Sequence, residues 1–174
     1  MKYFVLALNK RFDAAPIIMG ASQKIDTRYI NTESASKLPQ RELLFVDAYM
    51  GGAFPDVFSF PLFLVSEKVF DVIKMYEPGA VSKQVILLDG KYAQSGTYFL
   101  PILKSVDCIH PDTGKISDWR YVERLVLERD KLCKEAIFRP AGVSHAAAVV
   151  RLDLAESILK RGAKGIGLMP VEIK

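Results

Sequence analysis

Cysteine and histidine are scarce in this chain of 174 residues, which has two of each. The cysteines, Cys108 and Cys133, are too few for a disulfide framework, and neither belongs to a Cys-x-x-Cys pair that would hold zinc or perform redox chemistry. The histidines, His110 and His145, lie outside any His-Glu-x-x-His pattern. The sequence therefore predicts reduced thiols, a cytoplasmic location and no metal site.

Long apolar runs and phosphate-binding loops are also missing. No segment approaches the roughly 20 apolar residues of a membrane-spanning helix. The apolar start at residues 3–8 is followed at once by Asn9-Lys10-Arg11, so it is too short for a signal peptide and predicts a first β-strand. Gly165-Ile166-Gly167 lacks the third glycine and the following helix of a dinucleotide site. We expect no membrane contact and no cofactor.

A strong excess of charge of one sign is absent as well. The chain has 24 Lys and Arg against 20 Asp and Glu, which gives a formal charge of +4. Nucleic-acid binders gather their positive charge in a patch or stripe. Here six cations alternate with four anions between residues 119 and 139. This alternation predicts a solvated surface of mixed charge and no nucleic-acid partner.

What the sequence does contain is typical of one globular domain over residues 1–174, since half the residues are apolar and a quarter are charged. Two segments, residues 62–88 and 147–171, share one plan: a strand, a capping residue, an amphipathic helix, a glycine and another strand. Ser66 and Asp153 are the predicted N-caps. Each unit predicts a crossover to a parallel neighbouring strand.

Strands outnumber helices in the rest of the chain. Residues 81–106 predict an antiparallel hairpin, in which Pro101 should mark an edge strand or a bulge. Residues 43–47 predict a short buried strand, and residues 119–127 and 136–138 predict two more. Residues 26–41 show no period and predict a long surface loop. The predicted fold class is α+β, with a mixed, largely antiparallel sheet and two amphipathic helices packed on it.

Residues that could carry catalysis are thinly spread. Cys108 lies between Asp107 and His110, which suggests nucleophilic chemistry. In an extended segment, however, Cys108 and His110 share one face and Asp107 points to the other, so the three groups are not preassembled. We therefore predict no catalytic residues and interpret the two histidines as surface or locally bonded side chains.

Four residues are candidates for contact with a partner: Phe54, Asp56, Phe58 and Arg139. The two phenylalanines belong to a loop-like segment with Tyr49 and Phe60, where glycines and prolines interleave with the aromatics. Aromatic side chains on rigid turns often anchor interfaces, but they also fill cores beneath loops, and the core is the favoured interpretation. Arg139 could hold the carboxylate of Asp56 or Asp107, and a structural ion pair is the simpler reading.

Four stretches together resemble a bacterial family, the eleventh class of immunity proteins of polymorphic toxin systems, whose domain long carried only an unknown-function label. The resemblance covers residues 54–169 and depends on the order and spacing of the stretches. They are Pro55-Asp56-Val57-Phe58 leading into residues 61–67, residues 98–103 with Val106-Asp107, residues 126–128 through Ile137-Phe138-Arg139, and residues 149–153 through Gly162 to Gly165-Ile166.

The resemblance implies a small cytoplasmic protein, encoded beside a toxin, that neutralises the cognate toxin domain by binding it. It implies no catalytic residues. The main alternative is a small enzyme or ligand-binding domain whose site is assembled from scattered Asp, Glu, Arg and Tyr side chains, and a nucleic-acid-binding module ranks third. A neighbouring gene with a secretion or repeat region and a variable toxin domain would favour immunity, whereas a metabolic operon would favour an enzyme.

Overall fold

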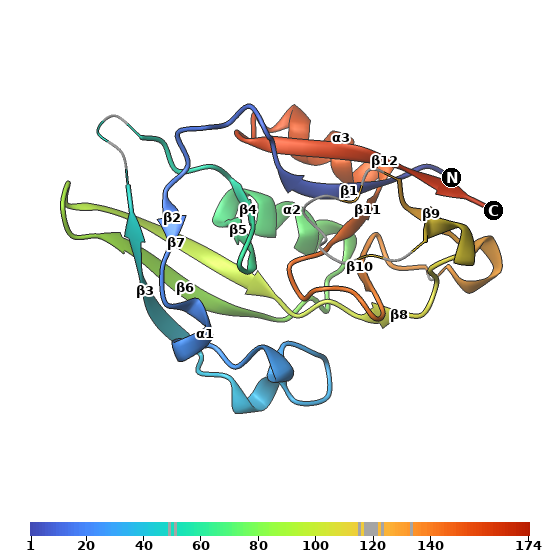
Figure 1. Ribbon diagram of the computed structural model, residues 1–174, viewed down its shortest axis with the longest axis horizontal. Helices are drawn as coiled ribbons and strands as arrows, with labels where there is room; N and C mark the ends of the chain where they lie inside the picture. The colour runs from blue at the N-terminus through green and yellow to red at the C-terminus, as the bar shows by residue number, and fades with distance from the viewer. Residues whose placement is uncertain (49, 51, 115, 117–121, 123, 133) are drawn as a thin grey trace.

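The computed structural model describes residues 1–48, 50, 52–114, 116, 122, 124–132 and 134–174. Within these ranges the strands form two mixed six-stranded sheets (Figure 1). The predicted α+β class is confirmed, but the strands are divided between two sheets and not gathered in one. The predicted strand over residues 119–127 is described only at its end, because residues 119–121 and 123 lie outside the described part of the chain.

The first sheet brings the two ends of the chain together in its centre. Its strands, in spatial order, are β8 (Ser105–Val106), β10 (Ile137–Pro140), β11 (Val149–Arg151), β1 (Tyr3–Leu8), β12 (Ile166–Ile173) and β9 (Val126–Leu127). The predicted first strand, β1, lies antiparallel to both β11 and β12. The two chain termini lie near each other, at the right of Figure 1.

The second sheet contains the predicted hairpin. Its strands, in spatial order, are β2 (Ile17–Ile18), β3 (Arg41–Asp47), β6 (Ser82–Asp89), β7 (Gln94–Pro101), β5 (Phe63–Ser66) and β4 (Val57–Ser59). The prediction that Pro101 marks an edge strand is wrong, because β7 lies between β6 and β5. Pro101 ends β7 and lies beyond the two residues that pair with β5. Its lack of a backbone N–H therefore interrupts no hydrogen bond between β7 and β5.

Five strands of each sheet share one topology. The orders β3-β6-β7-β5-β4 and β9-β12-β1-β11-β10 have the same pattern, with the first pair parallel and the other three pairs antiparallel. Helix α2 (Glu67–Tyr76) joins β5 to β6, and α3 (Leu152–Lys160) joins β11 to β12. The two strands that each helix joins are parallel but separated by one antiparallel strand, and not adjacent as predicted. In the second unit, that inserted strand is β1.

The two helices share a core with one face of each sheet. Val69, Val72 and Ile73 of α2 pack in one cluster with Leu154, Ala155 and Ile158 of α3, together with Leu6 of β1, Val65 of β5 and Val150 of β11. Two further clusters cover the opposite faces of the sheets. The apolar stripes predicted for the two helices therefore join the sheets through a common interior.

The segment over residues 26–41 is more than a surface loop. It follows a short helix, α1 (Ala21–Lys24), and contains two 3₁₀ turns, η1 (Thr27–Tyr29) and η2 (Ala35–Lys37). Ile30, Ala35 and Leu38 are buried against the second sheet. These three scattered apolar residues lack a helical or strand period, and so the sequence pattern did not reveal that the segment covers a sheet face.

One of the two predicted helix caps is confirmed. Ser66 precedes α2 with extended backbone angles, and its hydroxyl accepts a hydrogen bond from the Val69 amide at 3.4 Å. The cap predicted at Asp153 is wrong, because α3 begins at Leu152 and its N-cap is Arg151. Asp153 lies in the first turn, where a carboxylate is favoured by the unpaired amides of the helix start.

We expect Ser66→Ala to lower the free energy of unfolding by about 1 kcal/mol, since it removes the cap of α2. Ser36→Ala, at an exposed position of η2, is the matched control and should leave the stability within experimental error. Urea denaturation of the three proteins measures the difference. Equal midpoints for Ser66→Ala and the unmodified protein would contradict the capping role.

Candidate functional site

The aromatic residues Phe54 and Phe58 belong to a core cluster around Tyr98. Phe58 is 2% exposed, and its ring meets that of Tyr98 edge to face with centroids 5.2 Å apart. Phe54 is half-buried and stacks on the ring of Tyr98 with centroids 6.4 Å apart. The Tyr98 hydroxyl donates to the carbonyl of Pro55 at 2.6 Å, and burial raises the pKa of Tyr98. The core interpretation therefore describes both phenylalanines, while Tyr49 lies outside the described residues.

Asp56 joins the start of α2 to the start of β12. Its Oδ1 accepts a hydrogen bond from the Ser66 hydroxyl at 2.5 Å, and its Oδ2 accepts one from the Lys164 amide at 2.6 Å. The Asp56 amide in turn donates to the Lys164 carbonyl at 2.8 Å. The Lys68 ammonium lies 3.6 Å from Oδ2. The carboxylate is thus occupied by bonds that connect the two sheets.

Arg139 fastens the segment over residues 26–41 to β10. Its Nη1 donates to the carbonyl of Ile30 at 3.0 Å, and burial lowers the pKa of the Arg139 guanidinium. Among the described residues no carboxylate lies within ion-pair distance of it, so Arg139 bonds a backbone oxygen and neither Asp56 nor Asp107. The four predicted contact residues therefore do not form one surface.

The groups that suggested nucleophilic chemistry are separated or already bonded. Cys108 is fully buried in the core behind β1, whereas Asp107 is exposed. The Nδ1 of His110 accepts a hydrogen bond from the Asp112 amide at 3.1 Å. His145 donates from Nε2 to the carbonyl of Pro61 at 3.0 Å, and burial, reinforced by nearby Arg139, lowers the pKa of its imidazole.

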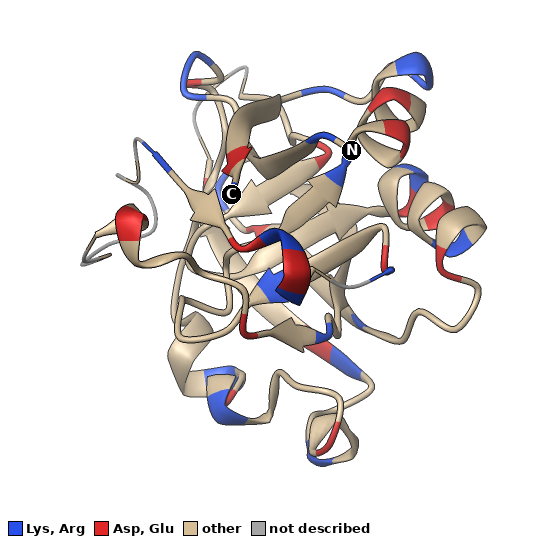
Figure 2. Cartoon of the chain, turned by 90° about the vertical axis from the view of Figure 1, so that its right-hand side faces the viewer, with Lys and Arg blue, Asp and Glu red and all other residues tan. Residues whose placement is uncertain are grey.

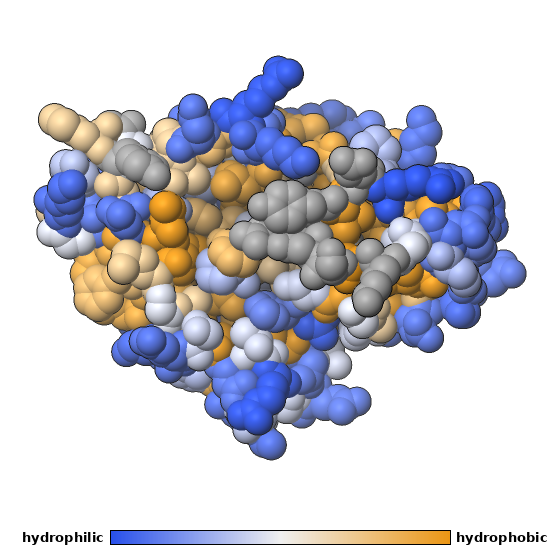
Figure 3. All heavy atoms as spheres, in the orientation of Figure 1, coloured by the Kyte–Doolittle hydropathy of each residue, from blue (hydrophilic) through white to orange (hydrophobic). Residues whose placement is uncertain are grey.

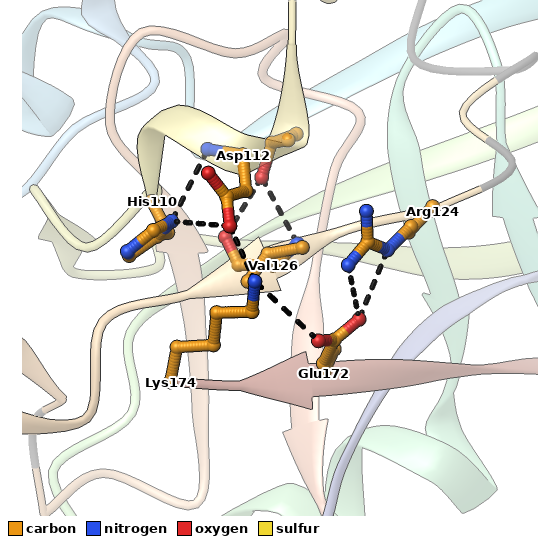
Figure 4. A network of polar contacts seen from close by, with 7 residues as sticks. His110, Asp112, Arg124, Val126, Glu172 and Lys174 are labelled. Atoms are coloured by element: carbon orange, nitrogen blue, oxygen red, sulfur yellow. Dashed lines mark hydrogen bonds and ion pairs between the residues drawn. The ribbon is translucent and has the colours of Figure 1, made fainter.

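A polar network surrounds the end of β12 (Figure 4). Lys174 pairs with Asp112 of the turn η3 (Pro111–Thr113) and lies 3.9 Å from Glu172. Glu172 pairs with Arg124 at 2.8 Å. The ammonium of Lys174 holds the pKa of Asp112 below its ordinary value. Because these pairs are solvent-exposed, each contributes little stability, and together they tie η3 to the end of the sheet.

Beside this network lies a cleft of about 370 Å3, which we call the terminal cleft. Its lining residues are Met1, Tyr3, Arg129, Leu132, Lys134, Arg151 and Ile173. Register assembles it: Tyr3 lies opposite Arg151 on one side and Val171 on the other, so Arg151 and Ile173 share the face of Tyr3. The Arg129 amide donates to the Lys174 carbonyl at 2.6 Å and brings the turn η5 (Arg129–Lys131) to the same place.

A second surface, the β3 edge, exposes apolar side chains at the other end of the molecule. We define it by four residues with 37% to 54% of their surface exposed: Ile17, Met19, Leu43 and Phe45. Figure 3 shows hydrophobic side chains gathered at the left of the molecule, over β2 and β3. The short buried strand predicted at residues 43–47 is present within β3, with Leu44 and Val46 buried, but its burial is wrong for Leu43 and Phe45.

The backbone of the β3 edge is open beyond β2. The two residues of β2 pair only with Val46 and Asp47, and the Met19 amide donates to the Phe45 carbonyl at 2.9 Å. Alternation along a strand directs the backbone groups of Leu43 to the same side as those of Phe45. There the Leu43 amide donates to the side chain of Glu42 at 3.0 Å, and no described strand pairs with it. A groove of about 330 Å3 runs between α1 and this edge.

No protein-family model matches this chain, and no curated protein matches it significantly. In the described ranges, no helix combines the length and apolar character that crossing a bilayer requires. The described histidine, cysteine and acidic residues form no cluster suited to a metal ion. The sequence indicated neither the terminal cleft nor the β3 edge.

We expect Asp56→Ala to lower the free energy of unfolding by about 2 kcal/mol, because the Ser66 hydroxyl and the Lys164 amide lose their charged acceptor. Asp71→Ala is the matched control, since Asp71 is an exposed carboxylate of α2 that pairs with Lys74 at 2.8 Å. Chemical denaturation compares the two. A similar loss of stability for both variants would contradict the linking role of Asp56.

The lowered pKa of His145 predicts a pH dependence of stability. The unfolded chain binds a proton at this residue more readily than the folded chain, so stability is lost as the pH falls below about 6.5. His145→Gln retains a donor for the Pro61 carbonyl and cannot titrate. Thermal melts from pH 8 to pH 5 should show a smaller decline for this variant, and parallel declines would contradict the assignment.

Proposed function

We propose that this protein is an immunity protein that neutralises a cognate bacterial toxin domain in the cytoplasm by direct, stoichiometric binding. The observation that carries the proposal is the β3 edge, where strand backbone that no described strand pairs with lies beside exposed apolar side chains. An extended peptide that adds to such an edge gains main-chain hydrogen bonds and side-chain contacts together. The resemblance found over residues 54–169 supplies the class of partner.

The occupant that fits this edge is an extended segment of the toxin domain. It would continue the line of β2, bond to the backbone of Leu43 and place apolar side chains against Leu43 and Phe45. Lys24, whose ammonium lies 3.8 Å from the Glu42 carboxylate, and Arg41 are exposed beside the open part of β3. The whole chain carries a formal charge of +4. An apolar segment flanked by acidic residues is therefore complementary to the β3 edge.

The chemistry of the described residues supports binding over turnover. Cys108 is fully buried, and the ring nitrogens of His110 and His145 that face the protein are bonded to backbone groups. These groups serve the fold. Inhibition of the toxin by binding is therefore favoured over an enzyme whose site is assembled from scattered Asp, Glu, Arg and Tyr side chains. The titration described next distinguishes toxin binding from the enzyme or ligand-binding alternative.

We expect the chain to copurify with the toxin domain encoded beside it, with a dissociation constant of about one nanomolar or below, equivalent to about 12 kcal/mol. Phe45→Lys should weaken the complex by about 100-fold or more, because it places a charge in a buried contact. Val81→Lys changes another exposed apolar residue away from the β3 edge and is the matched control. Calorimetric titration of the three proteins gives the affinities, and thermal melts verify that each is folded.

Three results would contradict the proposal. Equal affinity of Phe45→Lys and the unmodified protein would exclude the β3 edge as the binding surface. A dimer of the free protein that Phe45→Lys converts to a monomer, with toxin affinity unchanged, would assign the edge to a second copy of this chain. Protection of cells at substoichiometric levels, with a chemically altered toxin and no complex recovered, would favour the enzyme.

A further inference from the structure

The terminal cleft has one wall that is held rigidly. The Nε and Nη2 atoms of Arg151 each lie 2.8 Å from a carboxylate oxygen of Asp153, and its Nη1 donates to the carbonyl of Lys134 at 3.0 Å. All the guanidinium nitrogens are therefore engaged, and the Asp153 carboxylate balances the charge. The bond to the Lys134 carbonyl fixes the backbone from which the Lys134 side chain leaves.

Two other cations of the cleft are not balanced. Arg129 and Lys134 are exposed, and no carboxylate of the described residues lies within ion-pair distance of either. Three acidic side chains nearby are already paired: Glu128 with Lys131 at 3.0 Å, Glu172 with Arg124 at 2.8 Å, and Asp153 with Arg151. Asp130, the neighbour of Arg129 in η5, is exposed and does not line the cleft. The cleft thus retains positive charge on a side of the molecule where both signs otherwise alternate (Figure 2).

The floor between these cations is apolar. Leu132 and Ile173 are half-buried, and Tyr3, which is 4% exposed, lies beneath them with its ring against Phe138. A cleft with aliphatic floor residues and unbalanced cations fits a ligand that carries carboxylates next to aliphatic groups. Acidic groups at the rim of such a cleft gain charge-assisted hydrogen bonds, whereas the aliphatic groups gain burial.

We propose that the terminal cleft binds an acidic peptide segment whose carboxylates contact Arg129 and Lys134 and whose aliphatic side chains lie over Leu132 and Ile173. A nucleic acid fits less well, because the carboxylates of Glu128 and Asp130 interrupt the cations of the turn and no exposed aromatic ring offers a stacking platform among the described residues of the cleft. The inference is independent of the proposed toxin binding, since the cleft and the β3 edge share no residue.

The test uses the free, full-length protein and a fluorescently labelled peptide of alternating glutamate and leucine residues, with binding followed by fluorescence anisotropy. We expect saturable 1:1 binding that weakens as salt is added. The double variant R129Q/K134Q should weaken binding by about tenfold or more. The control variant K10Q/K160Q removes the same charge from exposed lysines outside the cleft and should keep the affinity within about twofold.

Three further arms settle the assignment. Phe45→Lys should leave peptide binding unchanged. Loss of peptide binding in this variant would place the peptide on the β3 edge and overturn the proposal. A peptide of alternating glutamine and leucine should not bind, and equal binding of it would overturn the role of the carboxylates. Tighter binding of a single-stranded DNA oligonucleotide, lost in R129Q/K134Q, would make nucleic acid the occupant and would also overturn the proposal. Equal losses of peptide affinity in R129Q/K134Q and K10Q/K160Q would overturn it as well.

Discussion

The insertion of β1 between β11 and β12 is the pairing on which the rest of the structure depends. It makes the sheet continuous, because β11 and β12 lie on opposite sides of β1 and contact it along their lengths. Its alternate side chains complete two cores: Leu6 joins the helix cluster, while Tyr3 and Val5 join the cluster on the other face. The same strand contacts the second sheet, where the Leu8 amide donates to the Ser59 hydroxyl at 3.1 Å. The terminal cleft exists only because this register places Arg151 and Ile173 beside Tyr3.

Local signals in the sequence predicted the parts of this fold that depend on neighbours along the chain. The period of Val69, Val72 and Ile73 indicated the buried face of α2, and the position of Ser66 indicated its cap. The errors fall where distant residues decide the outcome. At α3, Asp153 looks like a cap in sequence, but the chain enters the helix two residues earlier and the carboxylate is held by Arg151.

The candidate site was less predictable than the fold, for a physical reason. An aromatic or charged residue has the same sequence signature whether it faces a partner or fills an interior, and Phe58, Asp56 and Arg139 all turned out to make internal contacts. The β3 edge was hidden for the opposite reason. Leu43 to Val46 are apolar on both faces, which predicts burial on both, but in the structure Leu43 and Phe45, on one of these faces, are 37% and 54% exposed.

The two surfaces lie on different sheets and favour different contacts. The β3 edge offers backbone groups and apolar side chains, whereas the terminal cleft offers exposed cations over a small apolar floor. Amide hydrogen exchange in the complex with the neighbouring toxin domain tests the central claim, toxin capture at the β3 edge, most directly. If the toxin adds a strand at this edge, the Leu43 amide becomes strongly protected when the toxin binds. Unchanged exchange at Leu43 in a saturated complex would contradict the claim.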